Sequence, residues 1–196
     1  MNEPADPKQS DTPNTAGELI SADVDCDQIM VVNKDDKTKF VMYKNDTRVF
    51  IKGDYVVEKP KITQFKANQF QYMLKKNSAL LAFRNAVSQK LGGAPLDYYS
   101  DAKYNNVWPF IKTHKNSAQQ LCVLAVMDGV DKLVPITDLD NNKTYGIIPV
   151  LKVGAIKYHN LKGKWCIGLQ LEEIKIETNV TEIISDRPKV RFAHQL

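Results

Sequence analysis

The stretch KYHNLKGKWCIGLQLEEIKIE, residues 157–177, decides the fold because its hydrophobic pattern changes phase halfway along. Four apolar residues alternate along its first part: Trp165, Ile167, Leu169 and Leu171. This alternation is the period of a half-buried strand. Further on, Ile174 and Ile176 have the opposite parity, and one extra residue near Glu172-Glu173 would restore a common face. We therefore predict a β-bulge there, a feature by which small barrels turn the corners of long strands.

The composition of the chain is that of one globular domain with a tail. Its 196 residues, of which 43% are hydrophobic, suffice for a packed core. No apolar run approaches the roughly 20 residues that span a bilayer, and the N-terminus lacks the apolar segment of a secretory signal, so we expect no membrane partner. The three cysteines have no metal-binding spacing. A reduced intracellular location, with Cys122 and Cys166 in the core, is the simplest interpretation.

Charge is distributed unevenly along the chain. Residues 1–28 contain seven acidic residues and one basic residue, a net charge of −6, and the remainder, with 26 basic and 16 acidic residues, carries +10. Residues 1–27 are also rich in Asp, Pro, Ser and Thr, so we predict a disordered acidic arm. An acidic arm on a basic body is typical of nucleic-acid-binding proteins, and a tail that only increases solubility is the alternative.

Local patterns predict strands at both ends of the body and helices between them. Three β-like runs occupy residues 28–33, 38–44 and 47–53, and Asn45-Asp46 is a hairpin turn between the second and the third. Residues 67–91 are predicted to be helical. The evidence is the spacing of Phe70, Met73 and Leu74 in the first part, and then a second helix that Ser78 caps and Gly92-Gly93 ends.

The second half of the body is predicted to consist mostly of strands. The predicted segments are a tyrosine-containing loop at 94–106, strands at 107–115 and 120–128, a connection at 129–146, and a hairpin of 147–159 with 165–177. The last residues are mixed, with a short helix near 181–185 and a basic extension.

Residue patterns for catalysis are scarce. The nine glycines include no phosphate-binding loop, and His114, His159 and His194 have no metal-ligand spacing. We therefore expect no enzymatic activity and no metal or other cofactor.

Aromatic residues instead recur beside basic residues on the predicted strands. The candidate nucleic-acid-binding residues are Arg48, Phe50 and Lys52; Tyr104, Trp108, Phe110, Lys112, His114 and Lys115; and Lys157, Tyr158, Lys162, Lys164 and Trp165. Exposed rings stack on unpaired bases, at about 1–3 kcal/mol per base, while lysine and arginine neutralise phosphates. Any one ring could equally fill the core, Trp165 above all because it shares its parity with Ile167 and Leu169.

The order of the predicted segments adds a resemblance to a known family. The helical segment precedes an aromatic-rich loop, a basic strand, the buried strand of LCVLAVMDGVDKLVPI, and then KVGAIKYHNL and GLQLEEIKIE. Over roughly residues 60–177, this order resembles the single-stranded DNA-binding proteins of some phages and large DNA viruses. The resemblance implies an OB-fold with an inserted helical segment. The chain departs from the phage proteins by carrying its acidic arm at the N-terminus, and its hairpin at 38–53 has no clear counterpart.

Pattern and resemblance together predict a mainly β fold. We expect a disordered acidic arm at 1–27, an OB-like barrel with an inserted helical segment at 28–178, and an extension at 179–196. The expected function is sequence-independent binding of single-stranded DNA in intracellular DNA replication or recombination. The arm is expected to contact replication proteins, and self-association is left open. The alternative is a protein–protein interaction module or a virion structural protein whose sheet faces are merely polar.

Overall fold

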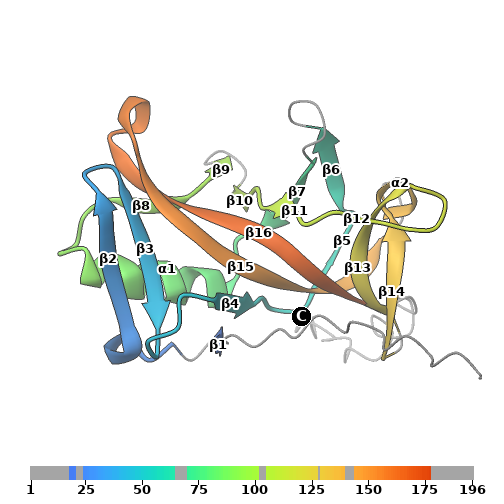
Figure 1. Cartoon of the computed structure of the whole chain (residues 1–196), viewed down its shortest axis with the longest axis horizontal. Coiled ribbons are helices and arrows are strands. Elements are labelled where there is room, and N and C mark those ends of the chain that lie inside the picture. Colours follow the sequence, from blue (N-terminus) through green and yellow to red (C-terminus); the bar gives the residue numbers. More distant parts are fainter. Residues whose placement is uncertain are drawn as a thin grey trace, which may run out of the picture.

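The computed structural model describes residues 18–20, 24–64, 70–101, 105–127, 129–139 and 144–177, which are mainly β (Figure 1). The strands before the main helix are β1 (Glu18–Ile20), β2 (Ile29–Asp35), β3 (Thr38–Tyr43), β4 (Val49–Lys52), β5 (Val56–Glu58), β6 (Lys61–Gln64) and β7 (Phe70–Lys75). Those after it are β8 (Leu96–Tyr98), β9 (Ser100–Asp101), β10 (Asn106–Val107), β11 (Phe110–Ile111), β12 (His114–Lys115), β13 (Leu121–Met127), β14 (Val130–Pro135), β15 (Tyr145–His159) and β16 (Lys164–Glu177). The helical elements are α1 (Ser78–Lys90), α2 (Ile136–Leu139), and the short 3-10 turns η1 (Cys26–Gln28) and η3 (Asn160–Lys162).

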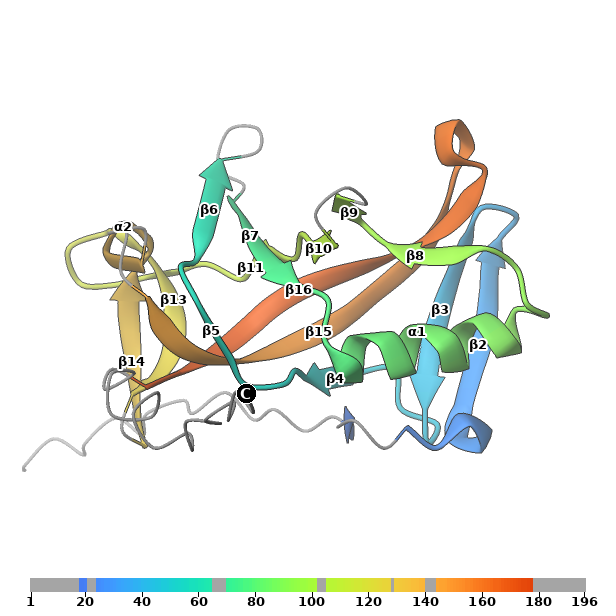
Figure 2. The same ribbon diagram turned by 180° about the vertical axis from the view of Figure 1, so that it is seen from behind.

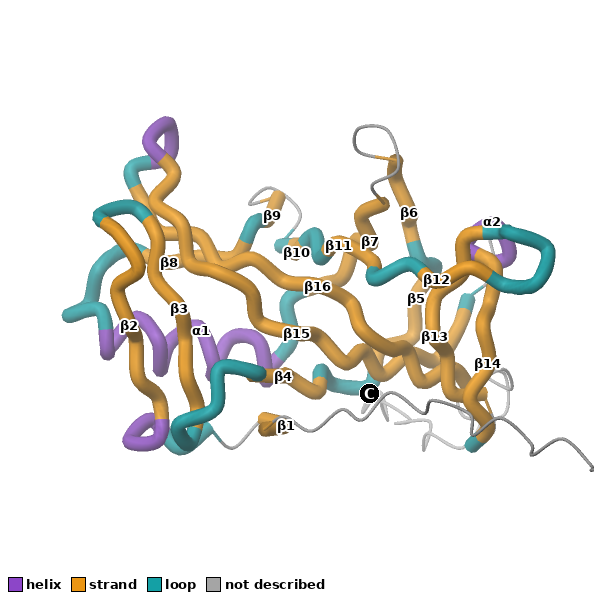
Figure 3. The backbone as a smooth tube through the Cα atoms, viewed as in Figure 1, coloured by secondary structure: helices purple, strands orange, loops and turns teal. Residues whose placement is uncertain are grey.

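The predicted hairpin of residues 147–159 with 165–177 is confirmed as the antiparallel pair of β15 and β16, and it lies at the centre of the fold. Strands β3, β4 and β5 pair with β15, whereas β8, β11 and β13 pair with β16. In Figures 1 and 3 the hairpin crosses the molecule diagonally, with β2 and β3 at one end and β13 and β14 at the other. Strands β1, β2, β7, β12 and β14 are one neighbour further out, and β6, β9 and β10 join the sheet through β7.

Two register shifts bend the hairpin. The first lies between Val150 and Leu151, where β16 contributes one extra residue, Glu172. This shift confirms the predicted bulge, and it keeps Ile174 and Ile176 on the buried side at 1% and 2% exposure. A second shift lies between Val153 and Ile156, where two residues of β15 face one residue of β16. The sequence analysis does not predict this second bulge.

The sheet curls as a half-barrel. The strand path runs from β1 through β4, β15, β16, β11, β7 and β10 to β9, with the remaining strands as branches. Among the described residues this pairing does not close into a ring. The mainly β prediction is confirmed at this level.

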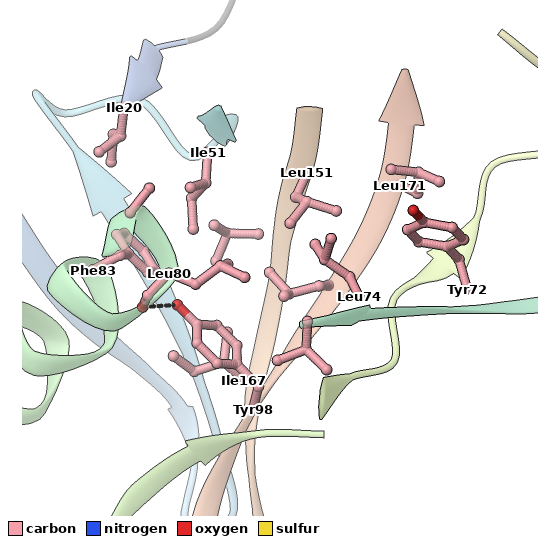
Figure 4. Packing of buried hydrophobic residues seen from close by; sticks show 14 of the residues in the cluster. Ile20, Ile51, Tyr72, Leu74, Leu80, Phe83, Tyr98, Leu151, Ile167 and Leu171 are labelled. Atoms are coloured by element: carbon pink, nitrogen blue, oxygen red, sulfur yellow. Dashed lines mark hydrogen bonds between the residues drawn. The ribbon is translucent and has the colours of Figure 1, made fainter. Parts of the chain in front are cut away.

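One face of the sheet packs against α1 and forms the core. Leu80 and Phe83 of α1 are fully buried beside Ile51, Leu151 and other residues of the strands (Figure 4). The view from behind in Figure 2 shows α1 lying alongside β4, β3 and β2. A buried hydrogen bond ties the helix to β8, because the Tyr98 hydroxyl donates to the Leu80 carbonyl oxygen at 2.6 Å. The predictions that Cys122 and Cys166 are core residues are confirmed, since both are 0% exposed.

The predicted helix over residues 67–91 is only half correct. Helix α1 is confirmed, and Gly92 and Gly93 end it with φ values of 68° and 78°. Its N-cap is Asn77, whose side chain accepts a hydrogen bond from the Leu80 amide. Residues 70–75, in contrast, are strand β7. Backbone pairing with β6, β10 and β11 overrides the local helical spacing there.

The predicted hairpin between residues 38–44 and 47–53 is also wrong. The turn exists, because Tyr43 and Asp46 exchange two backbone hydrogen bonds. Strands β3 and β4 then separate, and each pairs with a different part of β15. The hairpin that forms is instead β2 with β3.

The predicted N-terminal arm falls mostly outside the described residues, as does the whole extension at 179–196. Within the arm, β1 pairs in parallel with β4, and its Ile20 is 2% exposed. Residues 26–28 form η1. Residues 18–20 and 26–27 of the predicted arm thus belong to elements of the structure, and Ile20 is part of the core cluster.

Substitution of Leu74 tests β7 as a buried strand. Leu74 is 0% exposed, so Leu74→Ala should lower the free energy of unfolding by about 2–5 kcal/mol. Lys75→Ala, at the exposed next position, should change it by less than about 0.5 kcal/mol. Urea unfolding monitored by circular dichroism measures both values. Equal effects of the two substitutions would contradict the assigned strand.

Candidate nucleic-acid interface

The strand register brings residues from five strands into one row across the sheet. Phe50 of β4 lies opposite Lys152 of β15, which lies opposite Gln170 of β16. Gln170 in turn pairs with Phe110 of β11, and Phe110 pairs with Gln71 of β7. The neighbouring row, Ile51, Leu151, Leu171 and Ile111, is core on the opposite face. We name the face that carries Lys152, Gln170 and Phe110 the groove face.

An aromatic pocket of ≈ 320 Å³ opens on this face beside the second bulge. Tyr99, Trp108 and Phe110 line it together with Lys157, and Gly168 is also part of its wall. The pocket thus combines three rings with one ammonium group. A second hollow of ≈ 490 Å³, the lysine hollow, shares Phe110 and Gly168 and adds Lys152, Gly154 and Gln170.

Backbone hydrogen bonds hold the rings in place. The Tyr99 amide donates to the Ile167 carbonyl oxygen of β16 at 3.2 Å, and the Trp108 amide donates to the Tyr99 carbonyl oxygen at 3.0 Å. Phe110 is held by the β11–β16 ladder. All three rings are therefore positioned directly or indirectly by β16. The indole nitrogen Nε1 of Trp108 is buried and has no hydrogen-bond partner among the described residues.

Two glycines, Gly154 and Gly168, allow the two strands to approach closely at the second bulge. A Cβ atom on Gly154 would lie 3.3 Å from the Gly168 carbonyl oxygen, and one on Gly168 would lie 3.4 Å from the Ala155 carbonyl oxygen. The two backbones thus approach closely where two residues of β15 face one of β16. Because Gly168 lines both hollows, a side chain at this position would also take up space in them.

Lys152 and Lys157 form no ion pair with another described residue, whereas the predicted candidates Lys112 and Lys164 each do. Lys112 Nζ lies 2.6 Å from Glu172 Oε2, and Glu172 is 7% exposed. Lys164 Nζ lies 3.2 Å from Asp97 Oδ2. Lys112 thus has a carboxylate partner of its own, whereas Lys164 shares Asp97 with Lys76.

The N-terminal cluster of candidates is partly corrected. Phe50 is 8% exposed, so little of its ring is accessible for stacking. Lys52 is exposed on the same strand face, opposite Val150. Arg48 pairs with Asp46 at 3.0 Å on the surface.

The cluster around the β15–β16 turn is divided between two faces. Lys157 lines the aromatic pocket, but Tyr158 points to the other side, where its ring meets the edge of Trp165 at 5.3 Å. Lys39 Nζ lies 4.7 Å from the Trp165 ring centroid, and Trp165 also packs against the core. Tyr158 and Trp165 are therefore absent from the pocket that Lys157 lines, although all three residues lie near the same turn.

The remaining candidates lie away from both hollows or outside the described residues. Lys115 is exposed and His114 half-buried on β12, and Lys162 is exposed on η3. Tyr104 lies outside the described residues.

Tyr99 and Lys152 line the two hollows but are not among the candidates predicted from the sequence. Lys152 stands between the apolar residues Leu151 and Val153, so its outward direction is readable from the sequence alone. Tyr99 enters the pocket only because β8 pairs with β16, 70 positions or so further along the chain, as the register Tyr98–Ile167 shows. No local signal reveals that contact.

A buried ionic cluster supports one end of the groove face. Asp97 is 8% exposed and contacts Lys76 Nζ at 2.8 Å as well as Lys164. Burial acts to raise the pKa of Asp97, but hydrogen bonds from Lys76, the Tyr98 amide and Lys164 outweigh it, and the net shift of the pKa is downward. Burial also raises the pKa of the Tyr99 phenol and of the Cys166 thiol, so both groups are neutral at pH 7.

Comparisons with known proteins give no match: neither protein-family models, nor curated proteins, nor solved structures resemble this chain significantly. Within the described parts of the chain, no helix has the length and apolar character needed to cross a membrane. The same parts hold no group of three or more His, Cys, Asp or Glu side chains placed to bind a metal ion.

The lowered pKa of Asp97 predicts a pH-dependent contribution to stability. A carboxylate with a lowered folded-state pKa stabilises the fold above its unfolded value, here 3.8, and this stabilisation is lost as the pH falls through the folded value. At pH 7, Asp97→Asn should lower the free energy of unfolding by about 3–5 kcal/mol, because two lysines lose a buried partner. The difference in the free energy of unfolding between the wild-type protein and Asp97→Asn should decrease as the pH falls below 3.8.

Urea unfolding at several pH values measures this deficit. Asp131→Asn, at an exposed position of β14, is the matched control and should leave stability nearly unchanged. A deficit for Asp97→Asn that stays constant down to pH 2 would show that the ionised carboxylate is not its source.

Proposed function

We propose that this protein binds single-stranded DNA without sequence preference, by stacking bases on the rings of the aromatic pocket and by contacting phosphates with lysines. The observation that carries the proposal is the pocket itself. It joins Tyr99, Trp108 and Phe110 with Lys157 on an exposed sheet face. Every base has a face that can stack on a ring, so such a site favours unpaired strands irrespective of sequence.

The size and charge of the groove face support this function. The aromatic pocket, at ≈ 320 Å³, lies at the lower end of the range of about 300–1,000 Å³ typical of small-ligand sites. The lysine hollow extends it along β15 and β16. Lys157 and Lys152 stand in different hollows, so a strand passing over both would meet a positive charge at each.

An OB-like identity of the fold belongs to the same proposal. Its support is the curled sheet, the long bulged hairpin and the helix beside it, which agree with the segment order that resembles phage and viral single-stranded DNA-binding proteins. A role in DNA replication or recombination and contacts of the acidic arm with replication proteins follow from that resemblance alone. An intracellular location follows from it and from the three cysteines, which are widely spaced and odd in number.

A protein–protein interaction module is the second candidate, and one surface favours it. The β2–β3 hairpin exposes Met30, Val32 and Phe40 at 44%, 43% and 39%. Val32 and Phe40 are direct cross-strand neighbours, so these side chains form one apolar patch. Salt distinguishes the two candidates, because phosphate binding weakens steeply with salt and apolar contact does not.

Removal of the pocket lysine should weaken DNA binding for every sequence. Lys157→Ala should lower the affinity for oligo-dT and reduce the slope of log K against log salt by up to about 0.7, the effect of one lost phosphate contact. Lys90→Ala, an exposed substitution on α1, should leave the slope unchanged. Fluorescence anisotropy titrations at four salt concentrations measure it. An unchanged slope for Lys157→Ala would mean that the bound DNA makes no phosphate contact with Lys157.

The two tryptophans provide an internal optical test. Trp108 lines the pocket, whereas Trp165 lies under Lys39 on the other face. Oligo-dT should therefore quench the emission of the Trp165→Phe variant, in which only Trp108 remains. The Trp108→Phe variant should show little change. Quenching confined to Trp165 would contradict the pocket as the stacking site.

A further inference from the structure

The turn η3, which joins β15 to β16, carries an apolar side chain at its tip. Leu161 is 95% exposed, more than any other large hydrophobic residue in the described part of the chain. Figures 1 and 2 both show the turn extending beyond β8 and beyond the β2–β3 hairpin. Leu161 therefore contributes almost no packing to the described fold, and its side chain is available to a ligand.

Hydrogen bonds on both sides hold the base of this turn. The Tyr158 amide of β15 donates to the Lys37 carbonyl oxygen at 2.9 Å. The Trp165 amide of β16 donates to the Pro95 carbonyl oxygen at 3.0 Å. Only residues 159–163 lie beyond the last of these contacts on β15 and before the first strand residue of β16. The tip is therefore a short projection on a fixed base.

The aromatic pocket lies next to the turn. Lys157 lines the pocket, and His159 is the last residue of β15, on the same face and about 7 Å further along the strand. The ring centroid of His159 lies 6.4 Å from that of Tyr99, which also lines the pocket. The pocket thus ends within one strand step of the turn.

Charge distinguishes the two ends of the hairpin. Residues 150–171 contain four lysines and no acidic residue, and Glu172-Glu173 follow directly. Of these lysines, Lys164 is paired with Asp97. Residues 34–37 of the neighbouring β2–β3 turn carry two lysines and two aspartates, and so no net charge. The positive part of the hairpin, which attracts phosphates, is therefore the part that ends at η3.

We propose that η3 contacts the junction between single-stranded and double-stranded DNA, with Leu161 packed against the terminal base pair of the duplex. This inference rests on the proposed function and names the form of DNA that the site prefers. The single-stranded tail occupies the aromatic pocket, and the duplex begins at the turn. Leucine is one of the apolar side chains that proteins insert between bases. Lys162, exposed next to Leu161, is the cation available to the phosphates of the duplex end.

Hairpin DNA with a single-stranded tail tests the junction contact. The full chain is titrated with oligo-dT, with a DNA hairpin that carries the same oligo-dT as a 5′ or a 3′ tail, and with the blunt hairpin. Fluorescence anisotropy should show about 10-fold tighter binding to the tailed hairpin than to oligo-dT alone, in at least one polarity. This gain equals about 1.4 kcal/mol, less than full burial of a leucine side chain contributes. No gain in either polarity would overturn the inference.

The Leu161→Ser variant separates the apolar contact from the added phosphates of the duplex. It should bind oligo-dT as the wild-type protein does, but its gain for the tailed hairpin should fall to about 2-fold, the part that phosphates supply. Leu161→Met, which keeps an apolar side chain, should retain the gain. The matched control is Leu133→Ser, since Leu133 is 40% exposed on β14, and it should also retain the gain. A full gain in Leu161→Ser would show that Leu161 does not contact the junction.

The oligo-dT titration distinguishes this inference from the proposed function. Absence of binding to oligo-dT would contradict both. Binding to oligo-dT without a gain for the tailed hairpin would contradict the junction contact and leave the function intact. Because Leu161 lies outside the core, its variants should melt at the wild-type temperature, which shows that folded proteins are being compared.

Discussion

The bulged pairing of β15 with β16 is the constraint on which the rest of the structure depends. Six other strands pair directly with these two, so the register of the hairpin sets the positions of almost every part of the sheet. The extra residue Glu172 returns Ile174 and Ile176 to the core. Without that shift, a strand with a period of two would turn these isoleucines toward solvent.

The same bulges connect the fold to the candidate interface. Glu172 forms an ion pair with the ammonium group of Lys112. Because Lys112 directly follows β11, this ion pair fixes the segment that carries Phe110. At the second bulge Gly154 and Gly168 lie close together, and the two hollows of the groove face lie beside them. Features that bend the hairpin thus also shape the surface on which we propose that DNA binds.

Sequence patterns predict the parts of this arrangement that depend on local periodicity. The change of parity after Leu171 reveals the bulge, and Gly92-Gly93 reveals the end of α1. Residues 70–75 show the limit of such reasoning, since this segment pairs with β10 and β11 more than 30 residues further along the chain, and Tyr72 and Leu74 are buried in the resulting strand. The same contrast holds for the candidate site. Phe110 and Lys157 can be predicted from the alternation of side chains along their strands. Tyr99 and the partners of Lys112 and Lys164 depend on contacts far apart in the chain.

Preference for unpaired strands is the central claim, and a competition titration tests it most directly. The full chain is bound to labelled oligo-dT and displaced with unlabelled oligo-dT or with a duplex of the same length, at low and at moderate salt. A pocket of three rings requires bases whose faces are free, so the single strand should compete far more effectively at both salt concentrations. Equal competition by the duplex would mean that binding depends on phosphates alone, and it would contradict the stacking account.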